Sequence, residues 1–129
     1  MHKLKTFVFY WLPPLVWMIT IFLFSARPRF GITEQSVSDF FIFKLLHMIE
    51  YGGLYFLLFR AIHTANNNKH TSFKLAFIIS FIYAVSDEIH QTFVPTREGR
   101  MRDVVIDTVG IIAVYLLMKN QWKMIKKFI

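Results

Sequence analysis

The sequence contains no cysteine and few acidic residues. Without cysteine, disulfides, thiolate nucleophiles and Cys-ligated metals are excluded. Only 8 Asp and Glu stand against 15 Lys and Arg, which leaves a net charge of +7. We find no internal repeat and no low-complexity tract. We therefore predict a single domain that comprises residues 1–129.

Apolar residues are unusually abundant in this chain. Of the 129 residues, 55% are hydrophobic and 15 are Phe, and the mean hydropathy is +0.44. Ordinary soluble domains have about 45–50% apolar residues even with Gly counted. The basic residues flank apolar runs, which is typical of membrane topology and of contact with anionic lipid. We expect membrane lipids as partners and no nucleic acid; protein partners stay open.

Four apolar segments approach the ~20 residues that are needed to cross a bilayer. The predicted fold is all-α, a compact bundle of four transmembrane helices. The predicted helices are 4–26, 40–62, 73–93 and 103–118, of which the fourth is the shortest. The polar segments 27–39, 63–72 and 94–102 are predicted loops, and the chain ends in a lysine-rich tail.

Three local features of the sequence add expectations about the first two helices. The first apolar run, from Phe7 to Phe24, is longer than a typical signal-peptide core, so we interpret it as a retained anchor. Pro13–Pro14 should kink or loosen that helix. Gly52–Gly53 should let a neighbouring backbone approach the second helix closely.

The distribution of positive charge predicts the orientation of the bundle. With both termini in the cytoplasm, most basic residues fall on the inner side, as the positive-inside rule requires. The inner side is nearly all Lys and the outer side is all Arg, whose planar fork suits phosphate or carboxylate. We predict a multi-pass protein of the bacterial plasma membrane. The outer arginines are Arg27, Arg29, Arg97, Arg100 and Arg102.

Ionisable side chains interrupt the apolar segments near one end of each. A charge in hydrocarbon costs at least ~2.5–3.5 kcal/mol and rarely stays there without a partner or a task. Up-down threading gathers all of these groups near the outer face. They are Lys44, His47, Glu50 and Tyr51 on the second helix, Asp87, Glu88, His90 and Gln91 on the third, and Asp103 and Asp107 on the fourth.

Helical phase predicts that these groups face inward. At 100° per residue, the stripe from Lys44 to Tyr55 spans about 80°, and the stripe from Ser80 to Gln91 spans about 100°. Asp103, Asp107 and Gly110 form a narrow stripe on the fourth helix. Inward stripes would create a polar pocket beneath an arginine rim.

Simpler interpretations exist for the same residues. Asp103 suits a helix N-cap, His90 suits the membrane interface, and the loop arginines suit lipid phosphates. Structural ion pairs, such as Lys44 with Asp107 or Arg97 with Glu88, would hold the helices together without any ligand.

The motifs at these positions resemble those of the VanZ-like family of small membrane proteins. The likeness runs from the first helix to the fourth and covers most of the chain. Its most specific part begins at Asp87-Glu88-x-x-Gln91 and continues through Phe-x-Pro95-x-Arg97 to Arg102-Asp103. Further motifs are Phe-Ser25-Ala-Arg-Pro28, Lys44-x-x-His47-x-x-Glu50-Tyr51-Gly-Gly, and Asp103-x-x-x-Asp107-x-x-Gly110, where the family pattern has Asn in place of Asp107. The resemblance implies a cell-envelope setting and a link to glycopeptide (teicoplanin) resistance.

Three functional hypotheses follow. The leading one is an outer-leaflet-facing polar pocket that binds or processes an anionic lipid or lipid-linked cell-wall precursor. The second is a metal-dependent intramembrane hydrolase, and the third is a non-enzymatic accessory or scaffold subunit. We expect no cofactor, with a divalent metal only under the second hypothesis, and whether the protein is an enzyme stays open. The candidate catalytic residues are His47, Glu88 and Asp103, and the candidate ligand-binding residues are Arg27, Lys44, Tyr51, Asp87, Gln91, Arg97, Arg102 and Asp107.

Overall fold

A computed structural model describes residues 2–27, 37–95, 97 and 99–129. These residues form helices and connections and contain no strand, which confirms the all-α class. The long helices are α1 (His2–Ser25), α2 (Val37–Asn66), α3 (Lys69–Gln91) and α4 (Met101–Asn120). The short helix α5 (Trp122–Ile125) and the 3-10 turn η1 (Lys126–Phe128) follow.

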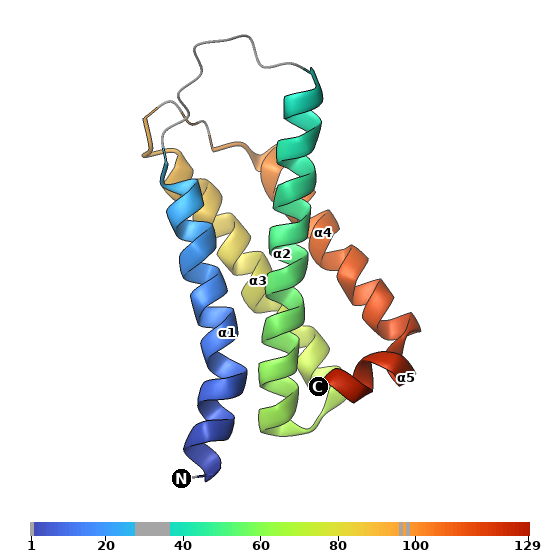
Figure 1. The fold of residues 1–129 in the computed structure, drawn as a ribbon. Coiled ribbons are helices and arrows are strands. Elements are labelled where there is room, and N and C mark those ends of the chain that lie inside the picture. Colours follow the sequence, from blue (N-terminus) through green and yellow to red (C-terminus); the bar gives the residue numbers. More distant parts are fainter. Residues whose placement is uncertain (1, 28–36, 96, 98) are drawn as a thin grey trace.

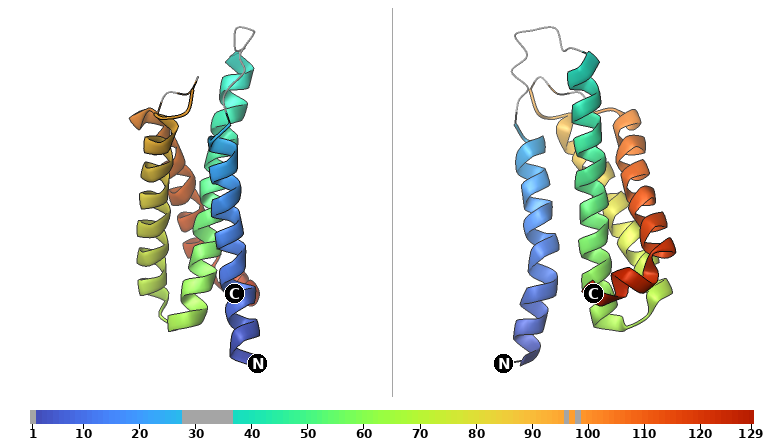
Figure 2. Two further views of the ribbon diagram at one scale, coloured as in Figure 1. Left: turned by 90° about the vertical axis from the view of Figure 1, so that its left-hand side faces the viewer. Right: turned by 45° about the vertical axis from the view of Figure 1, so that its right-hand side comes forward.

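The four long helices run alternately up and down (Figure 1). Both chain termini lie at one end of the bundle, which we call the terminal end (Figures 1 and 2). The opposite end, which we call the polar end, holds the C-terminal ends of α1 and α3 and the N-terminal ends of α2 and α4. Helix α2 is central and packs against α1, α3 and α4. The predicted antiparallel threading is therefore present in the bundle.

The predicted helix boundaries differ most between α2 and α3. The segment 63–72 was expected to be a loop, but α2 continues to Asn66 and α3 begins at Lys69. The turn is this short because Asn67 takes a left-handed conformation, with φ 52°, and the Asn68 side chain accepts a hydrogen bond from Thr71 N as the N-cap of α3. The Asn-rich sequence thus reverses the chain within two residues. Of the predicted loop 27–39, residues 28–36 lie outside the described part.

Helices α2 and α4 pack closely against each other at two glycines. A Cβ on Gly110 would lie 2.3 Å from Met48 O, and a Cβ on Gly52 would lie 2.7 Å from Val114 Cγ2. Only glycine lets the two backbones approach this far. The expected close approach is therefore confirmed at Gly52, with Gly110 as its partner.

Helix α1 packs less deeply than the others. It continues through Pro13–Pro14 without interruption. Near its middle, Trp17 Nε1 donates a hydrogen bond to Glu50 O at 2.9 Å, and the Tyr83 hydroxyl donates one to Met18 O at 2.6 Å. Much of its apolar surface faces outward.

Two helices of the described residues are long and apolar enough to cross a membrane. They are Lys5–Ser25, with mean hydropathy 1.9, and Phe41–Asn66, with 1.3. Only 11% and 28% of their apolar windows are buried, which is unlike the core helix of a soluble protein. Crossing of the membrane by α3 and α4 stays a prediction.

Candidate functional site

The structure brings the predicted site residues together at the polar end. Their exposure falls into three classes. The buried residues are Tyr51, Asp87, Glu88, Gln91 and Asp107, the partly buried ones are Lys44, His47, Arg97 and Asp103, and the exposed ones are Arg27 and Arg102. Their roles in catalysis or ligand binding stay predictions.

Lys44 and Asp103 join α2 to the first turn of α4. The Lys44 ammonium forms an ion pair with Asp103 Oδ1, and both side chains are mostly covered, with 12% and 16% exposed. Arg102 Nε lies 3.7 Å from the same oxygen, while its side chain is 53% exposed. Asp103 was also considered as an N-cap, but the N-cap of α4 is Arg100. Asp103 therefore serves as a shared anion for two cations.

One helical turn deeper, His47 faces Asp107. His47 Nδ1 lies 3.5 Å from Asp107 Oδ1, and Asp107 is completely buried. Neither carboxylate oxygen of Asp107 has a hydrogen-bond partner among the described residues, and the same is true of His47 Nδ1. Since buried polar atoms are normally paired, this pair keeps unused capacity to donate and accept hydrogen bonds.

Asp87 joins α3 to α1. Its Oδ1 accepts a hydrogen bond from the Ser25 hydroxyl, and its Oδ2 accepts one from Gln91 Nε2 at 3.0 Å. Ser25 is itself buried, with 3% of its surface exposed. Ser25 lies within one of the family motifs but was not a predicted site residue, because nothing in the sequence marks its partner 62 residues away.

Glu88 organises the connection into α4. Its Oε2 accepts a hydrogen bond from Arg100 N at 3.0 Å, which satisfies a backbone donor at the start of that helix. A Cβ on Gly99 would lie 2.2 Å from Glu88 O, so only glycine fits beside α3 here. The sequence did not predict this close packing of Gly99. Its position in a short loop was the only feature that could have indicated it.

Arg97 fastens the α3–α4 connection to the end of α1. Its Nε donates to Arg27 O at 2.9 Å, and its Nη2 donates to Phe24 O at 2.9 Å. Carbonyl groups at a helix C-terminus have no partner within the helix, and the guanidinium supplies one. A third bond runs from Nη1 to Gln91 Oε1 at 3.3 Å. Arg97 thereby acts as a clasp: its guanidinium joins the α3–α4 connection to the C-terminal end of α1.

Further polar atoms line the interior below this layer. The hydroxyl groups of Tyr51, Tyr55 and Ser80 are buried and have no hydrogen-bond partner among the described residues. All three residues are fully enclosed, with 0% exposed. They lie on the stripes that helical phase predicted to face inward. The polar interior therefore continues beyond the ionisable groups.

The described part of the chain contains no preformed site for a metal ion. There, no group of three or more His, Asp and Glu is arranged to hold a metal ion. Glu88 and Asp103 are engaged by Arg100 N and Lys44. A metal hydrolase is therefore not favoured by any contact described here.

These features define a helical bundle with two segments able to cross a membrane and a polar layer between its helices. Residues 7–125 match the VanZ/LLP1 family. The chain belongs to this family, which confirms the resemblance noted in the sequence. No curated protein and no solved structure matches the chain. Family membership and the two apolar helices indicate a membrane protein.

Proposed function

We propose that all four long helices cross the bacterial plasma membrane, with the terminal end in the cytoplasm and the polar end facing outward. Support comes from large apolar side chains that face outward on every one of them. Examples are Ile19, Phe41, Ile82 and Val105, which are 59%, 66%, 60% and 61% exposed. Apolar surface of this extent is normally covered, and lipid covers it in a membrane protein. The lysines at the terminal end fit the positive-inside rule.

At the polar end, the protein binds or processes the anionic headgroup of an envelope lipid or lipid-linked cell-wall precursor. One observation carries this proposal. The Arg102 guanidinium is largely exposed, and below it lies the buried His47–Asp107 pair with unused hydrogen-bonding capacity. An arginine fork binds phosphate by charge-assisted bonds, while the pair beneath would contact the remaining polar atoms of the ligand. Arg27, also exposed, adds a second cation.

If the ligand is processed as well as bound, His47 is the candidate general base. An imidazole beside a carboxylate is stabilised when it takes up a proton. Asp107 supplies that carboxylate, 3.5 Å away. Glu88 and Asp103, the other catalytic candidates, already accept from Arg100 N and Lys44. The geometry therefore favours His47 among the three.

The family supplies a physiological setting for this proposal. The resemblance to VanZ-like proteins links the chain to glycopeptide resistance, and a ligand from the cell-wall pathway fits that link. Deletion of the protein should then increase susceptibility to teicoplanin, and a plasmid copy should restore it. An Arg102→Gln copy should restore it less well at equal protein level.

Binding itself provides the sharper test. Purified protein in bicelles is titrated with a fluorescent phosphatidylglycerol and with a polyprenyl pyrophosphate, and phosphatidylcholine serves as the neutral lipid. Arg102→Gln should weaken binding of the anionic lipids by roughly tenfold or more, because one charge-assisted contact is lost. Lys123→Gln, which removes an exposed charge at the terminal end, should have little effect. Equal weakening by both variants would contradict a site at the polar end.

A second candidate, an accessory subunit without a ligand, is favoured by a different observation. Asp87, Gln91 and Arg97 are joined to one another and to α1 by the chain's own atoms. Such a network holds helices together with no ligand present. In that case polar-end variants should lose folding yield and phenotype in parallel, whereas the binding proposal predicts folded variants that do not bind.

A further inference from the structure

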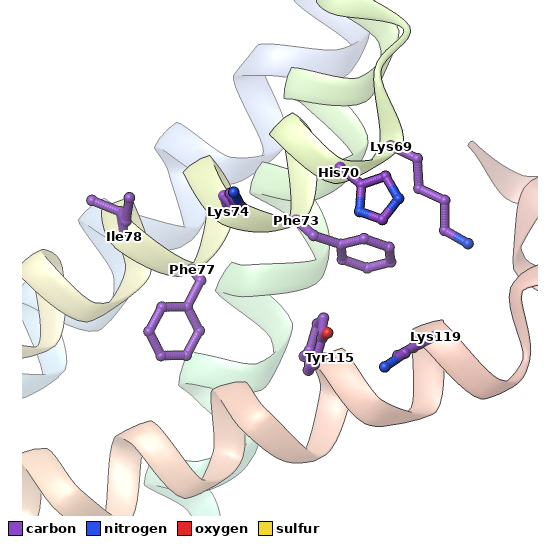
Figure 3. A pocket seen from close by; sticks show the side chains of 8 residues that line it. All are labelled: Lys69, His70, Phe73, Lys74, Phe77, Ile78, Tyr115 and Lys119. Carbon is purple, nitrogen blue, oxygen red and sulfur yellow. The ribbon is translucent and has the colours of Figure 1, made fainter.

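A pocket lies at the terminal end of the bundle, away from the polar layer. There, α3 and α4 enclose a pocket of about 410 Å³. Its lining residues are Lys69, His70, Phe73, Lys74, Phe77, Ile78, Tyr115 and Lys119 (Figure 3). None of them was a predicted site residue.

The lining divides into an aromatic wall and a basic group. Figure 3 shows Phe73 and Phe77 extending from α3 toward α4, and Tyr115 extending from α4 toward α3. The rings of Phe73 and Tyr115 meet edge to face, with centroids 5.3 Å apart. The basic residues are Lys69, His70, Lys74 and Lys119. A ligand for this pocket needs both an anionic part and an apolar part.

The lysines of the pocket lack acidic neighbours in this half of the chain. Every Asp and Glu falls within residues 34–50 and 87–107, so segments 51–86 and 108–129 contain none. The contacts of two pocket lysines are aromatic instead. Lys69 Nζ lies 4.3 Å from the centre of the Trp122 ring, and Lys119 Nζ lies 6.0 Å from that of Tyr115. No Asp or Glu side chain of these segments can neutralise this cluster.

An apolar surface continues from the pocket along α3. The rings of Phe77 and Phe81 are stacked, with centroids 6.3 Å apart. Ile78, Phe81 and Ile82 are 49%, 38% and 60% exposed. From Phe73 to Ile82 the helix rises about 14 Å, close to half of the ~30 Å hydrocarbon core. This length matches an acyl chain that spans one leaflet.

We propose that this pocket is a specific site for one anionic phospholipid. The phosphate contacts Lys69, Lys74 and Lys119, and an acyl chain lies against Phe77, Ile78 and Phe81. In the topology proposed above, the bound lipid belongs to the inner leaflet. The inference concerns residues that the polar site does not use, so either site can exist without the other.

The chain offers a matched control for the lysines. The variant Lys69→Gln/Lys74→Gln/Lys119→Gln removes three charges from the pocket. The variant Lys123→Gln/Lys126→Gln/Lys127→Gln removes the same charge from exposed tail residues of the same end, none of which lines the pocket. Native mass spectrometry in a mild detergent counts the phosphatidylglycerol molecules that stay bound to each variant, with phosphatidylcholine as the neutral comparison. Circular dichroism and gel filtration establish that each variant is folded.

With both variants made in an Arg102→Gln background, which weakens lipid binding at the polar end, the pocket variant should retain roughly tenfold less phosphatidylglycerol than Arg102→Gln alone, since each lysine near a phosphate contributes separately. The tail variant should stay within about twofold, because none of its three lysines lines the pocket. Equal losses in both variants would show diffuse attraction and overturn the site. Equal retention of phosphatidylcholine would overturn the role of the lysines.

A second variant tests the apolar part. Ile78→Asn places an uncharged polar side chain on the exposed apolar strip and should weaken retention of the lipid while the three lysine charges stay unchanged. Glycerol phosphate, which carries the headgroup chemistry without acyl chains, should compete weakly. If glycerol phosphate competes as well as phosphatidylglycerol, the pocket binds a soluble anion and the lipid proposal is wrong.

Discussion

His47 on α2 and Asp107 on α4 face each other inside the bundle, with Nδ1 3.5 Å from Oδ1. One turn nearer the polar end, Lys44 pairs with Asp103 between the same two helices. Residues three and four apart lie on one helical face, so the two pairs form a ladder. The ladder therefore joins α2 to α4 at two successive helical turns.

A double-mutant cycle on the deeper pair measures the strength of this ladder. His47→Ala should lower the free energy of unfolding by about 3 kcal/mol, because it leaves a buried carboxylate without its partner. Asp107→Asn should cost about 1 kcal/mol or less, since it removes the charge and keeps the shape. In the double variant much of the His47→Ala penalty should disappear. Reversible unfolding in mixed micelles gives all three values, and additive penalties would show that the two residues do not interact.

The glycine contact between α2 and α4 makes a second prediction. Gly110→Ala should destabilise the bundle by about 1–3 kcal/mol, because the new Cβ would lie 2.3 Å from Met48 O and the backbones must separate. Gly53→Ala is the control. Its Cβ would meet Trp17 at 3.5 Å, an ordinary contact, and alanine favours helix by up to ~1 kcal/mol over glycine. Similar penalties at both positions would argue against the close approach.

Arg97 and Arg102 should respond differently to substitution, although both were predicted to bind ligand. Arg97→Lys should destabilise the protein by about 1.5–3 kcal/mol, because lysine cannot reproduce the fork that holds Phe24 O and Arg27 O. Arg102→Gln should change stability by less than about 1 kcal/mol, as expected of an exposed ion pair. Thermal unfolding of the two purified variants tests this difference. A stable Arg97→Lys protein would contradict the clasp.

The bond between Ser25 and Asp87 makes a fourth prediction. Ser25→Ala should destabilise the contact of α1 with α3 by about 1–3 kcal/mol, since a buried carboxylate oxygen loses its donor. Ser86→Ala removes a hydroxyl that bonds only within its own helix, to Tyr83 O, and is exposed. This control should be close to neutral. Limited proteolysis near residue 27 would report local release of α1.

The sequence was sufficient to predict the helices and to predict that their polar stripes face the interior of the bundle. Periodic placement of Lys44, His47 and Tyr51 puts them on one face, and alternate threading then directs that face toward α4. The family resemblance was also correct. Boundaries were less accurate, because apolar content alone does not reveal that His63 to Asn66 still form helix. The end of α2 is set by the turn at Asn67 and Asn68.

Pairing between helices was beyond the sequence. Lys44 was considered as a partner of Asp107, whereas it pairs with Asp103. The choice depends on the axial alignment of α2 and α4, which Gly52 and Gly110 set by close packing. The role of Arg97 as a clasp depends on carbonyl groups, which every residue has, and no side-chain pattern marks them. Short-range patterns therefore predicted positions but not partners.

The central claim is that the polar end faces the outside of the cell. Because the chain has no cysteine, single cysteines can be introduced and labelled in intact cells with a membrane-impermeant maleimide. Arg100→Cys, exposed at the polar end, and Lys123→Cys, exposed at the terminal end, are the informative pair. If the polar end faces outward, Arg100→Cys is labelled in intact cells and Lys123→Cys is labelled only after lysis. The reverse pattern, or labelling of both in intact cells, would contradict it.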